Sequence, residues 1–325
     1  MTRHCCLMLT LCSMTLWGCT GETGIPADGG SVLPDLGNPG VHDTDASVIV
    51  ADMGQGDTVA DLGVDAGTAD FDPGVGTAYL TNYSNNSGGS ADIFVSKLDT
   101  AGNFVWARSF GNANTNYAQG IAVDASGNVY TTGILNGTVD LDPGPGIANL
   151  TSAGEDDIFI SKLDSAGNFV WARSIGGSDY DRPSGITVDS AGNVYTTGNF
   201  RGTVDFDPGA GTANLSAPSG DVYGDIFISK LDSAGEFEWA RSMGGDRREE
   251  SRGIAVDMAG NIHTTGHFSG TMDFDPGAGT ANLTSFNAIA TYDIFVSKLD
   301  NAGNYIWAKS MGGPYGELSN AIAVD

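Results

Sequence analysis

Short runs of apolar and β-branched residues, separated by turns rich in Gly, Asp and Asn, dominate the chain after its first 20 residues. Four such runs follow one another at 185–188, 193–198, 225–231 and 237–242. Aromatic and β-branched side chains favour strands, and no sustained helical period appears beyond residue 20. Apolar residues fall on both faces of the third run, DIFISKL, which is typical of a sheet covered on both sides. The pattern therefore predicts four consecutive strands and an all-β fold.

This four-strand unit recurs along the chain. The octamer DIFVSKLD at 92–99 returns, with a Val-to-Ile change in two copies, at 157–164, 225–232 and 293–300. The starting positions are 65 to 68 residues apart, and each copy precedes an Asp-x-x-Gly-Asn type of turn and a WAR or WAK segment. Asp that accepts backbone N–H groups and Gly in the left-handed region suit a short hairpin. A period this regular predicts units that bury their apolar faces against one another.

Antiparallel units of four strands, repeated around an axis, form the blades of a β-propeller. The recurring pattern GIAVD-x-x-GNVY-x-TG, followed by DIFV-x-KLD-x-x-GNFVWA, resembles the SBBP-type bacterial β-propeller repeat over residues 58–325. The resemblance implies an all-β propeller of four-stranded antiparallel blades. It also implies a family mostly linked to secreted or surface proteins, without a single activity. The long connection that contains DFDPG departs from the usual repeat.

The repeats divide the body of the chain into blades. The predicted propeller spans 67–325, and a degenerate first blade at 58–110 overlaps the segment before it. The complete blades and the start of another are predicted at 120–177, 185–245, 253–313 and 321–325. Two interpretations stay open at this point. The strand at 321–325 joins the N-terminal strands and closes a four-bladed ring, or the chain is a fragment of a larger propeller.

The N-terminal 66 residues differ in composition from the repeats. Residues 1–18 combine Arg3 with an apolar run at 7–17 that is too short to span a membrane, which is typical of a signal peptide. The ending Leu-Trp-Gly-Cys resembles the bacterial lipobox, and the resemblance implies lipidation of Cys19; an ordinary secretory signal is the alternative. Residues 19–66 contain no Lys, Arg or aromatic residue and predict a disordered acidic tether rich in Gly, Asp and Pro.

Lipid attachment at Cys19 predicts an exported protein that is anchored at the bacterial cell envelope. Thr20 differs from the Asp associated with inner-membrane retention in some bacteria, so the outer membrane is the expected location. All four cysteines lie within residues 5–19, which excludes disulfides and thiolate zinc sites from the repeats. The net charge of −26, from 40 acidic and 14 basic residues, argues against nucleic acid and against membrane contact beyond the anchor.

The strongest chemical motif is DFDPG, or DLDPG, which occurs once in each repeat. Two carboxylates two residues apart, beside a Pro-Gly turn, offer oxygen ligands to Ca2+, the one cofactor the sequence suggests. The alternative is a turn in which Asp accepts backbone hydrogen bonds, because Ca2+ usually needs ~6–8 oxygens. The candidate calcium ligands are Asp70, Asp72, Asp140, Asp142, Asp205, Asp207, Asp273 and Asp275.

Successive strands of a blade run in opposite directions. The connection from the fourth strand of one blade to the first strand of the next therefore lies on the same face of the propeller as the connection between the second and third strands. These connections are long and differ among the repeats, whereas the turns of the opposite face are nearly identical. Loops on a rigid scaffold commonly carry function, so the variable face is the predicted partner-binding surface. Its candidate residues are Tyr117, Tyr180, Asp181, Arg182, Arg247, Arg248, Arg252 and Tyr315.

Signatures of catalysis and zinc binding are scarce. The sequence has no nucleophile elbow, P-loop or zincin motif. His263 and His267 share one extended strand and are expected ~13 Å apart, too far for one zinc ion. The sequence predicts a non-enzymatic binding or structural module at the cell surface, with an unknown protein or glycan ligand. The alternative is a carbohydrate-active enzyme, a glycosidase or lyase, that uses acidic residues of the variable face.

Overall fold

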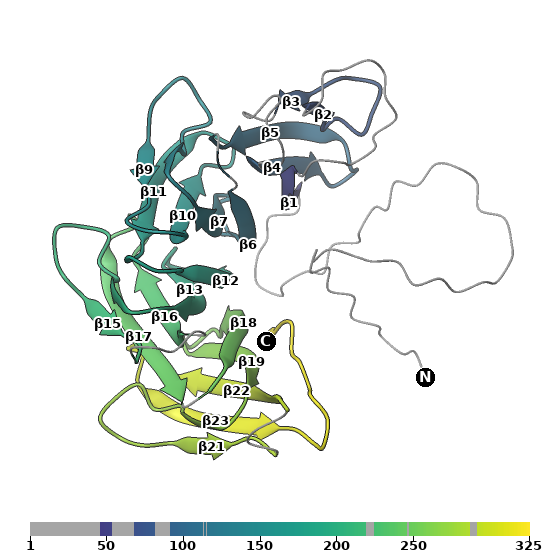
Figure 1. Ribbon diagram of the computed structural model, residues 1–325. Coiled ribbons are helices and arrows are strands. Elements are labelled where there is room, and N and C mark those ends of the chain that lie inside the picture. Colours follow the sequence, from purple (N-terminus) through teal and green to yellow (C-terminus); the bar gives the residue numbers. More distant parts are fainter. Residues whose placement is uncertain are drawn as a thin grey trace, which may run out of the picture.

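The computed structural model describes residues 46–53, 68–81, 92–112, 114, 116–218, 224–245, 247–286 and 291–325. All regular elements in these residues are β-strands, and they follow one another in an open arc (Figure 1). Among the same residues there is no helix that could cross a membrane. The predicted all-β fold of four-stranded antiparallel units is confirmed.

Four successive repeats supply the strands. The first contains β1 (Ala46–Met53), β2 (Thr68–Asp70), β3 (Tyr79–Thr81), β4 (Asp92–Asp99) and β5 (Phe104–Phe110). The second contains β6 (Tyr117–Val123), β7 (Val129–Leu135), β8 (Thr138–Asp140), β9 (Asn149–Thr151), β10 (Asp157–Leu163) and β11 (Phe169–Ile175). The third contains β12 (Arg182–Val188), β13 (Val194–Phe200), β14 (Thr203–Asp205), β15 (Asn214–Ser216), β16 (Asp225–Leu231) and β17 (Phe237–Gly245). The fourth contains β18 (Glu249–Val256), β19 (Ile262–Phe268), β20 (Thr271–Asp273), β21 (Asn282–Thr284), β22 (Asp293–Leu299) and β23 (Tyr305–Met311).

The long strands of each repeat form one antiparallel sheet, which we call a blade and number 1 to 4 in chain order. Blades 2, 3 and 4 have the orders β6-β7-β10-β11, β12-β13-β16-β17 and β18-β19-β22-β23. The short strand pairs, such as β14-β15, form hairpins within the connection between the second and third strands. The hairpins of blades 2, 3 and 4 reach back to the end of the preceding blade: β20 pairs with β17, and isolated bridges join Gly111 to Asp140 and Gly176 to Asp205.

Blade 1 has three described strands, in the order β1-β4-β5. Ser47 of β1 lies opposite Leu98 and Met53 opposite Asp92, the register that Val194 and Phe200 make with β16 in blade 3. β1 therefore takes the place of the second strand. This corrects the sequence analysis, which put 46–53 in the tether and began the first blade at 58. The β-branched run in β1 suits a strand, but it lies further ahead of DFDPG than in the other repeats. The rest of the predicted signal peptide and tether lies outside the described residues.

The predicted strand at 321–325 forms no regular strand. Ala321 and Ile322 lie close beside Gly253 of β18, as Ile254 lies beside Gly185 of β12. Residues 321–325 thus follow the path of an innermost strand after blade 4, without a partner strand among the described residues. Blades 1 and 4 lie at opposite ends of the arc, so this segment does not close a four-bladed ring with blade 1 (Figure 1).

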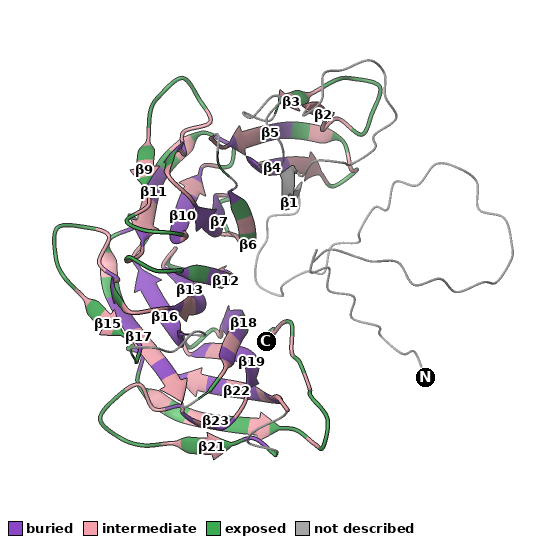
Figure 2. Ribbon diagram, viewed as in Figure 1, coloured by how far each residue is buried: buried purple, intermediate pink, exposed green. Residues whose placement is uncertain are grey.

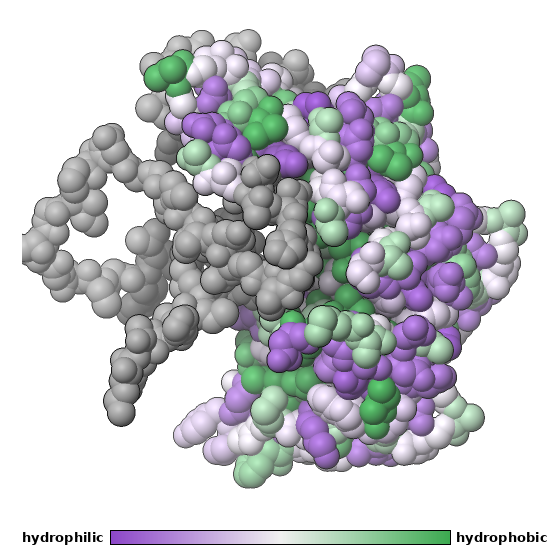
Figure 3. Space-filling view, turned by 180° about the vertical axis from the view of Figure 1, so that it is seen from behind, coloured by the Kyte–Doolittle hydropathy of each residue, from purple (hydrophilic) through white to green (hydrophobic). Residues whose placement is uncertain are grey.

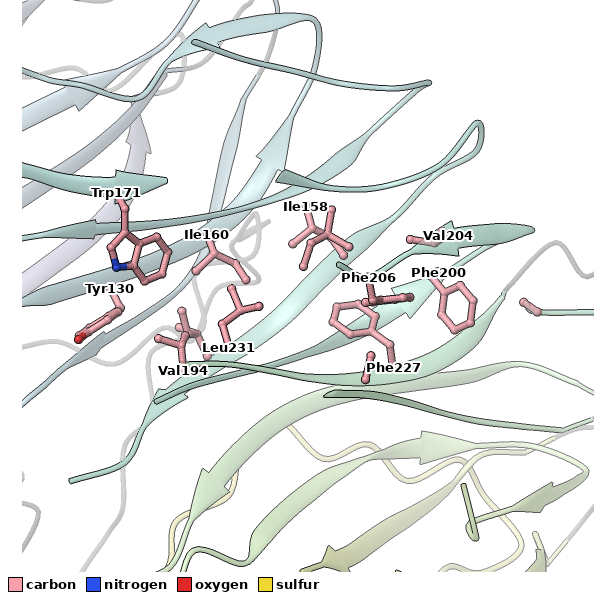
Figure 4. Close-up of a cluster of buried hydrophobic side chains, with 14 residues drawn as sticks. Tyr130, Ile158, Ile160, Trp171, Val194, Phe200, Val204, Phe206, Phe227 and Leu231 are labelled. Atoms are coloured by element: carbon pink, nitrogen blue, oxygen red, sulfur yellow. The ribbon is translucent and has the colours of Figure 1, made fainter. Parts of the chain in front are cut away.

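Apolar side chains are buried between neighbouring blades. Figure 2 shows buried residues on the strands and exposed residues mainly on the turns and hairpins. Between blades 2 and 3, Ile158, Ile160 and Trp171 of one blade face side chains of the next (Figure 4). Those partners include Phe200, Phe206 and Phe227, each 0% exposed. Burying one such side chain stabilises the fold by about 1.5–3 kcal/mol, so the blade contacts are the main source of stability.

A set of polar contacts, which we call the latch, repeats at each described junction. In blade 2, the indole Nε1 of Trp171 donates to the carbonyl of Ser233 at 3.2 Å, in the turn between β16 and β17. Arg173 donates from Nε to the carbonyl of Gly235 at 2.9 Å. Gly235 has φ +78°, and a β-carbon there would lie 2.9 Å from the Trp171 ring. Trp106 with Arg108, and Trp239 with Arg241, make the same contacts with the next blade.

Candidate functional site: a cleft lined by arginines on the variable-loop face

The two kinds of variable connection lie together, as the sequence predicted. A β-carbon at Gly177, in the loop between β11 and β12, would lie 2.8 Å from the carbonyl of Thr203 in a neighbouring hairpin. On the other face, a β-carbon at Gly192 would lie 3.2 Å from Ser233, so the two short turns of blade 3 also adjoin. The loops between blades are therefore grouped on one rim of the arc.

A cleft of about 570 Å3 opens on this rim, between the innermost strands of blades 2, 3 and 4. β12 and β18 provide two of its walls, and the end of β13 provides another. Its charged and aromatic lining residues are Tyr180, Arg182, Arg201, Arg248, Glu250 and Arg252, and its uncharged ones are Gln119, Pro183, Ser184, Asn199 and Ser251.

Polar contacts fix the floor of the cleft where blades 3 and 4 meet. The hydroxyl groups of Ser184 and Ser251 lie 2.8 Å apart. The side-chain amide of Asn199 donates to the carbonyl of Glu249 at 2.8 Å and accepts from the N–H of Ser251 at 3.3 Å. These contacts join β12, β13 and β18, so the lining residues are positioned by strands rather than by the loops alone.

Two arginines stack on the ring of Tyr180. The guanidinium carbons of Arg182 and Arg201 lie 5.0 and 5.6 Å from the ring centre, in the range of cation–π contacts. Arg182 also donates to Asp156, with Nη2 2.6 Å from Oδ2. The guanidinium of Arg201 has no carboxylate partner among the described residues. One cationic group of this wall is therefore paired with a carboxylate, and the other has no such partner within the described part of the chain.

The opposite wall is built around Glu250. Arg248 donates from Nε to Oε1 of Glu250 at 2.8 Å, and Arg252 donates to the other carboxylate oxygen. Burial raises the pKa of Glu250, but the hydrogen bond from Arg248 and the charges of Arg252 and Arg248 outweigh burial and hold the pKa below its ordinary value. His267 lies behind, its Nε2 3.7 Å from Glu250. Burial, together with the two arginines, lowers the pKa of His267 to about 4, so the ring is neutral at pH 7.

The charges of the cleft do not cancel. Four arginines line it or its edge, and two carboxylates, those of Glu250 and Asp156, oppose them. The excess is positive, in a chain whose net charge is −26. The net charge of the side chains at the cleft is thus positive, whereas that of the whole chain is negative. A positively charged cleft favours an anionic group.

The candidate residues on the variable face separate into three groups. The structure brings Tyr180, Arg182, Arg248 and Arg252 to the cleft, whereas Tyr117, Arg247 and Tyr315 are exposed and do not line it. Asp181 is 0% exposed and supports the loop, because its carboxylate accepts from the N–H groups of Gly177 and Arg201. Burial raises its pKa to about 7.

The candidate residues of the sequence analysis did not include seven lining residues: Gln119, Pro183, Ser184, Asn199, Arg201, Glu250 and Ser251. Arg201 follows strand β13 at the position that Asn136 and Ser269 hold after β7 and β19. A comparison of the repeats at this position was the available signal. Arg201 lies at the start of the connection between β13 and β16, ahead of the DFDPG motif.

The aspartates of the DFDPG motifs form turns. Asp205 Oδ1 accepts from the N–H groups of Asp207 and Ala213, at 3.1 and 2.8 Å, and Asp207 Oδ1 accepts from Gly209 at 2.8 Å. The same bonds recur at Asp70, Asp140 and Asp273. Within the described residues no group of three or more His, Cys, Asp or Glu side chains is arranged to hold a metal ion. The turn role is therefore seen directly, and calcium binding stays a prediction.

The two histidines of β19 have separate surroundings. His263 lies 6.3 Å from the Trp307 ring, in an edge contact like those of Tyr130 with Trp171 and Tyr195 with Trp239. His267 instead contacts Tyr292, at 5.1 Å between ring centres. His263 thus has the packing role of a tyrosine, and the two rings do not form a shared zinc site.

Known proteins resemble this chain mainly in its repeats. The family model described as the SBBP beta-propeller repeat matches residues 105–133 and 170–199. An uncharacterized WD repeat-containing protein of Acanthamoeba polyphaga mimivirus is 26% identical over 237 residues, which are 66% of this chain and 17% of that protein. The regulatory protein FlaEY of Caulobacter vibrioides is 28% identical over 138 residues, 41% of this chain and 14% of that protein. The chain thus spans under a fifth of the length of either relative.

A solved structure also aligns with the chain. The crystal structure of a protein of unknown function from Bacteroides caccae covers 70% of this chain and 93% of its own, with 10% identity and a TM-score of 0.22. The sequence comparisons support a module made of propeller repeats.

Proposed function

We propose that this chain is a non-enzymatic binding module of the bacterial cell envelope, and that the arginine-lined cleft binds a ligand bearing carboxylate groups. The observation that supports this is the excess of arginine in one cleft of a strongly acidic protein. The planar guanidinium of Arg201 has no carboxylate partner among the described residues, and its geometry suits the two oxygens of a carboxylate. Aromatic and serine side chains beside it add contact area and neutral hydrogen-bonding groups.

Location at the envelope forms the second part of the proposal. The apolar run at 7–17 and the Leu-Trp-Gly-Cys ending support export and lipidation of Cys19, with the outer membrane as the expected membrane. Mass spectrometry of the mature N-terminus tests this part separately, because it expects an acylated Cys19 and an absent 1–18 segment.

The carbohydrate-active enzyme of the sequence analysis receives less support from the cleft. Glycosidases use two carboxylates that flank the scissile bond, about 5–9.5 Å apart. Glu250 is the acidic residue among those that line the cleft, and two arginines hold its carboxylate. The buried carboxylate of Asp181 is bonded to backbone N–H groups instead.

Calorimetric titration of the full chain tests the binding proposal with two carboxylate probes, an oligogalacturonate and a tetraglutamate peptide. Tighter binding of one probe shows whether the natural source is a glycan or a protein. Arg201→Ala should weaken the better probe at least about tenfold, since a hydrogen-bonded charge contributes ~1.5–3 kcal/mol. Arg247→Ala is the matched control, because it removes the same charge from an exposed site outside the cleft. Equal losses in both variants, or no binding of either probe, would refute the proposal.

A further inference from the structure

Two pockets with equivalent linings lie at the outer side of the arc, and neither shares a lining residue with the arginine-lined cleft. The pocket between blades 3 and 4 has a volume of about 310 Å3, and the pocket between blades 1 and 2 has a volume of about 680 Å3. Both volumes fall in the range of small-ligand sites, about 300–1,000 Å3. Each pocket lies over the outermost long strand of one blade, between the hairpin of that blade and the hairpin of the next. The hairpin strands β15 and β21 mark this outer side in Figure 1.

Each pocket contains the arginine of a latch as a hydrogen-bond donor. Arg241 donates from Nε to the carbonyl of Gly303 at 3.2 Å, and its Nη2 and Nη1 donate to the carbonyls of Ala302 and Ala240, both at 2.9 Å. These bonds use three of the five N–H groups of a guanidinium. No carboxylate lies within ion-pair distance of Arg241 among the described residues. Arg108 makes the equivalent bonds in the other pocket. Backbone carbonyls thus hold each guanidinium in place and use only part of its donor capacity.

Each pocket also contains a hydrogen-bond acceptor and apolar side chains. Asp275 lines the pocket from the DFDPG turn of blade 4, where its Oδ1 accepts the N–H of Gly277 at 2.8 Å. A carboxylate can accept several hydrogen bonds, so this bond fixes Asp275 without using all of its acceptor capacity. The apolar side chains are those of Leu215, Pro276 and Tyr305. The same four positions of the other pocket hold Asp142, Leu80, Pro143 and Phe169.

The junction between blades 2 and 3 shows what fits into this space. The equivalent of Asn304 is Glu236 there, and Oε1 of Glu236 accepts from Nη2 of Arg173 at 2.8 Å. The other carboxylate oxygen of Glu236 lies 4.0 Å from a β-carbon placed on Gly209, in the hairpin turn. Asn304 instead donates its side-chain amide to Asp300 of its own turn at 2.9 Å, and the asparagine of the other pocket does the same. One junction thus fills with its own carboxylate the space that forms a pocket at the other two.

The groups in each pocket favour an uncharged ligand that is rich in hydroxyl groups. The charges of the arginine and the aspartate offset each other, so the pocket does not favour one sign of charge. A hydroxyl group can donate to the carboxylate and can also accept from the guanidinium, as the Glu236 oxygen accepts from Arg173. Figure 3 shows hydrophilic and hydrophobic atoms mixed over the visible face, a surface that suits a ligand with both hydroxyl and C–H groups.

We propose that each of the two pockets binds an uncharged sugar residue of a glycan. The hydroxyl groups of the sugar accept from the latch arginine and donate to the aspartate of the hairpin turn. A C–H face of the sugar packs on the aromatic ring, Phe169 in one pocket and Tyr305 in the other. This ligand class differs from the carboxylate ligand proposed for the cleft, so the two proposals can be tested separately.

An array of uncharged hexose oligosaccharides, probed with the full chain, identifies the best ligand, and calorimetric titration then measures its affinity. Asn168→Glu combined with Asn304→Glu copies the residue of blade 3 into both pockets, and it should weaken binding at least about tenfold. The fold should be kept, because Glu236 is accommodated at the same position. Asn149→Glu combined with Asn282→Glu is the matched control and should leave the affinity unchanged. It adds the same charge at exposed positions of the adjoining hairpins, outside the pocket linings.

Glu236→Asn is the converse change and keeps the proposal testable if the double variant fails to fold. It removes the carboxylate from the junction between blades 2 and 3, so the number of glycans bound per chain should rise from two to three. Arg201→Ala, in the cleft, should leave the binding of the uncharged glycan unchanged, which distinguishes the failure of one proposal from that of the other. No binding to any uncharged glycan, equal affinities of the double variant and its control, or an unchanged stoichiometry in Glu236→Asn would overturn the proposal.

Discussion

Phe206 lies at the centre of the contact between blades 2 and 3, and its replacement by Ala measures how much the DFDPG hairpin contributes to the fold. The ring is 0% exposed, and its centre lies 5.4 Å from that of Phe200 and 5.1 Å from that of Phe227. Phe-to-Ala changes in a closed core cost about 3–5 kcal/mol, the lost transfer free energy together with the cavity. Two lost ring contacts favour the upper half of this range, about 4 kcal/mol.

The assay is chemical unfolding of the full chain, followed by circular dichroism and by tryptophan fluorescence. Two probes are needed because repeat proteins can unfold in parts, and coincident curves justify a single free energy of unfolding. Phe286→Ala provides the control: the same atoms are removed from a side chain that is 67% exposed, so a change within about 0.5 kcal/mol is expected. A loss below about 1 kcal/mol for Phe206→Ala would refute the inference that the hairpins complete the core between blades.

Three further predictions follow from the latch, the buried loop acid and the DFDPG turns. Arg173→Ala should lower the free energy of unfolding by about 1.5–3 kcal/mol, because Arg173 donates hydrogen bonds to the carbonyls of Gly235 and Ala234 in the next blade. Lys309→Ala, at the same position of blade 4, should change the free energy of unfolding by under about 0.5 kcal/mol, because Lys309 is exposed. Burial raises the pKa of Asp181 to about 7, above the ~3.9 of an unfolded aspartate, so the stability that its protonation provides is lost as pH rises from about 4 to 7. Asp181→Asn should therefore flatten the stability profile in that window, and an unchanged slope in unfolding curves at pH 4.5 and 7 would contradict the assignment. Calcium binding by the DFDPG motifs should raise the melting temperature in millimolar Ca2+ above that in EDTA, because an ion that binds the folded state stabilises it. Melting temperatures that agree within about 1 °C would leave Asp205 and Asp207 with their turn role alone.

Much of the fold follows from local sequence signals. The Asp189–Asn193 turn was predicted from residue types, and the structure shows its basis: Asp189 Oδ1 accepts from Ala191 and Asn193, and Gly192 has φ +82°. The strands on either side of such turns were also predicted within a few residues. Local signals suffice here because each strand and turn is specified by its own residues.

The place of β1 could not be found in the same way. Its assignment depends on pairing with β4, about 45 residues further along, and the intervening segment is longer than in the other repeats. An alignment anchored on DFDPG therefore put the second strand too late. Charge and glycine content suggested a tether, yet one short β-branched run within it had a strand edge available in the folded blade.

The variable loops share one hydrogen bond that is not evident from their sequences, and we call it the frame. In it, an acidic side chain accepts the backbone N–H of the residue four positions earlier. Asp181 accepts the N–H of Gly177, Glu249 that of Gly245 and Glu317 that of Gly313, in each case four residues earlier. Asp stands at this position once and Glu twice, and in the first such loop Asn116 instead donates its side-chain amide to Oδ1 of Asn112, so no single residue type recurs. Only the hydrogen bond is repeated, and a comparison of residue types along the sequence does not reveal it.

The frame distinguishes the loop residues that fix the loop's conformation from the loop residues that line the cleft. The carboxylates of Asp181 and Glu249 are 0% exposed and tie each loop to its own start. Tyr180 and Arg248 each stand one residue before a frame acid, and both reach the cleft. The residues at the tip of a loop can therefore change while its backbone path is kept, as long as an acceptor stays four residues after the second glycine of the Gly-Gly pair. Specificity in such a repeat is thus expected to vary at the residues that flank the frame acid, which is where Arg182 and Arg248 lie.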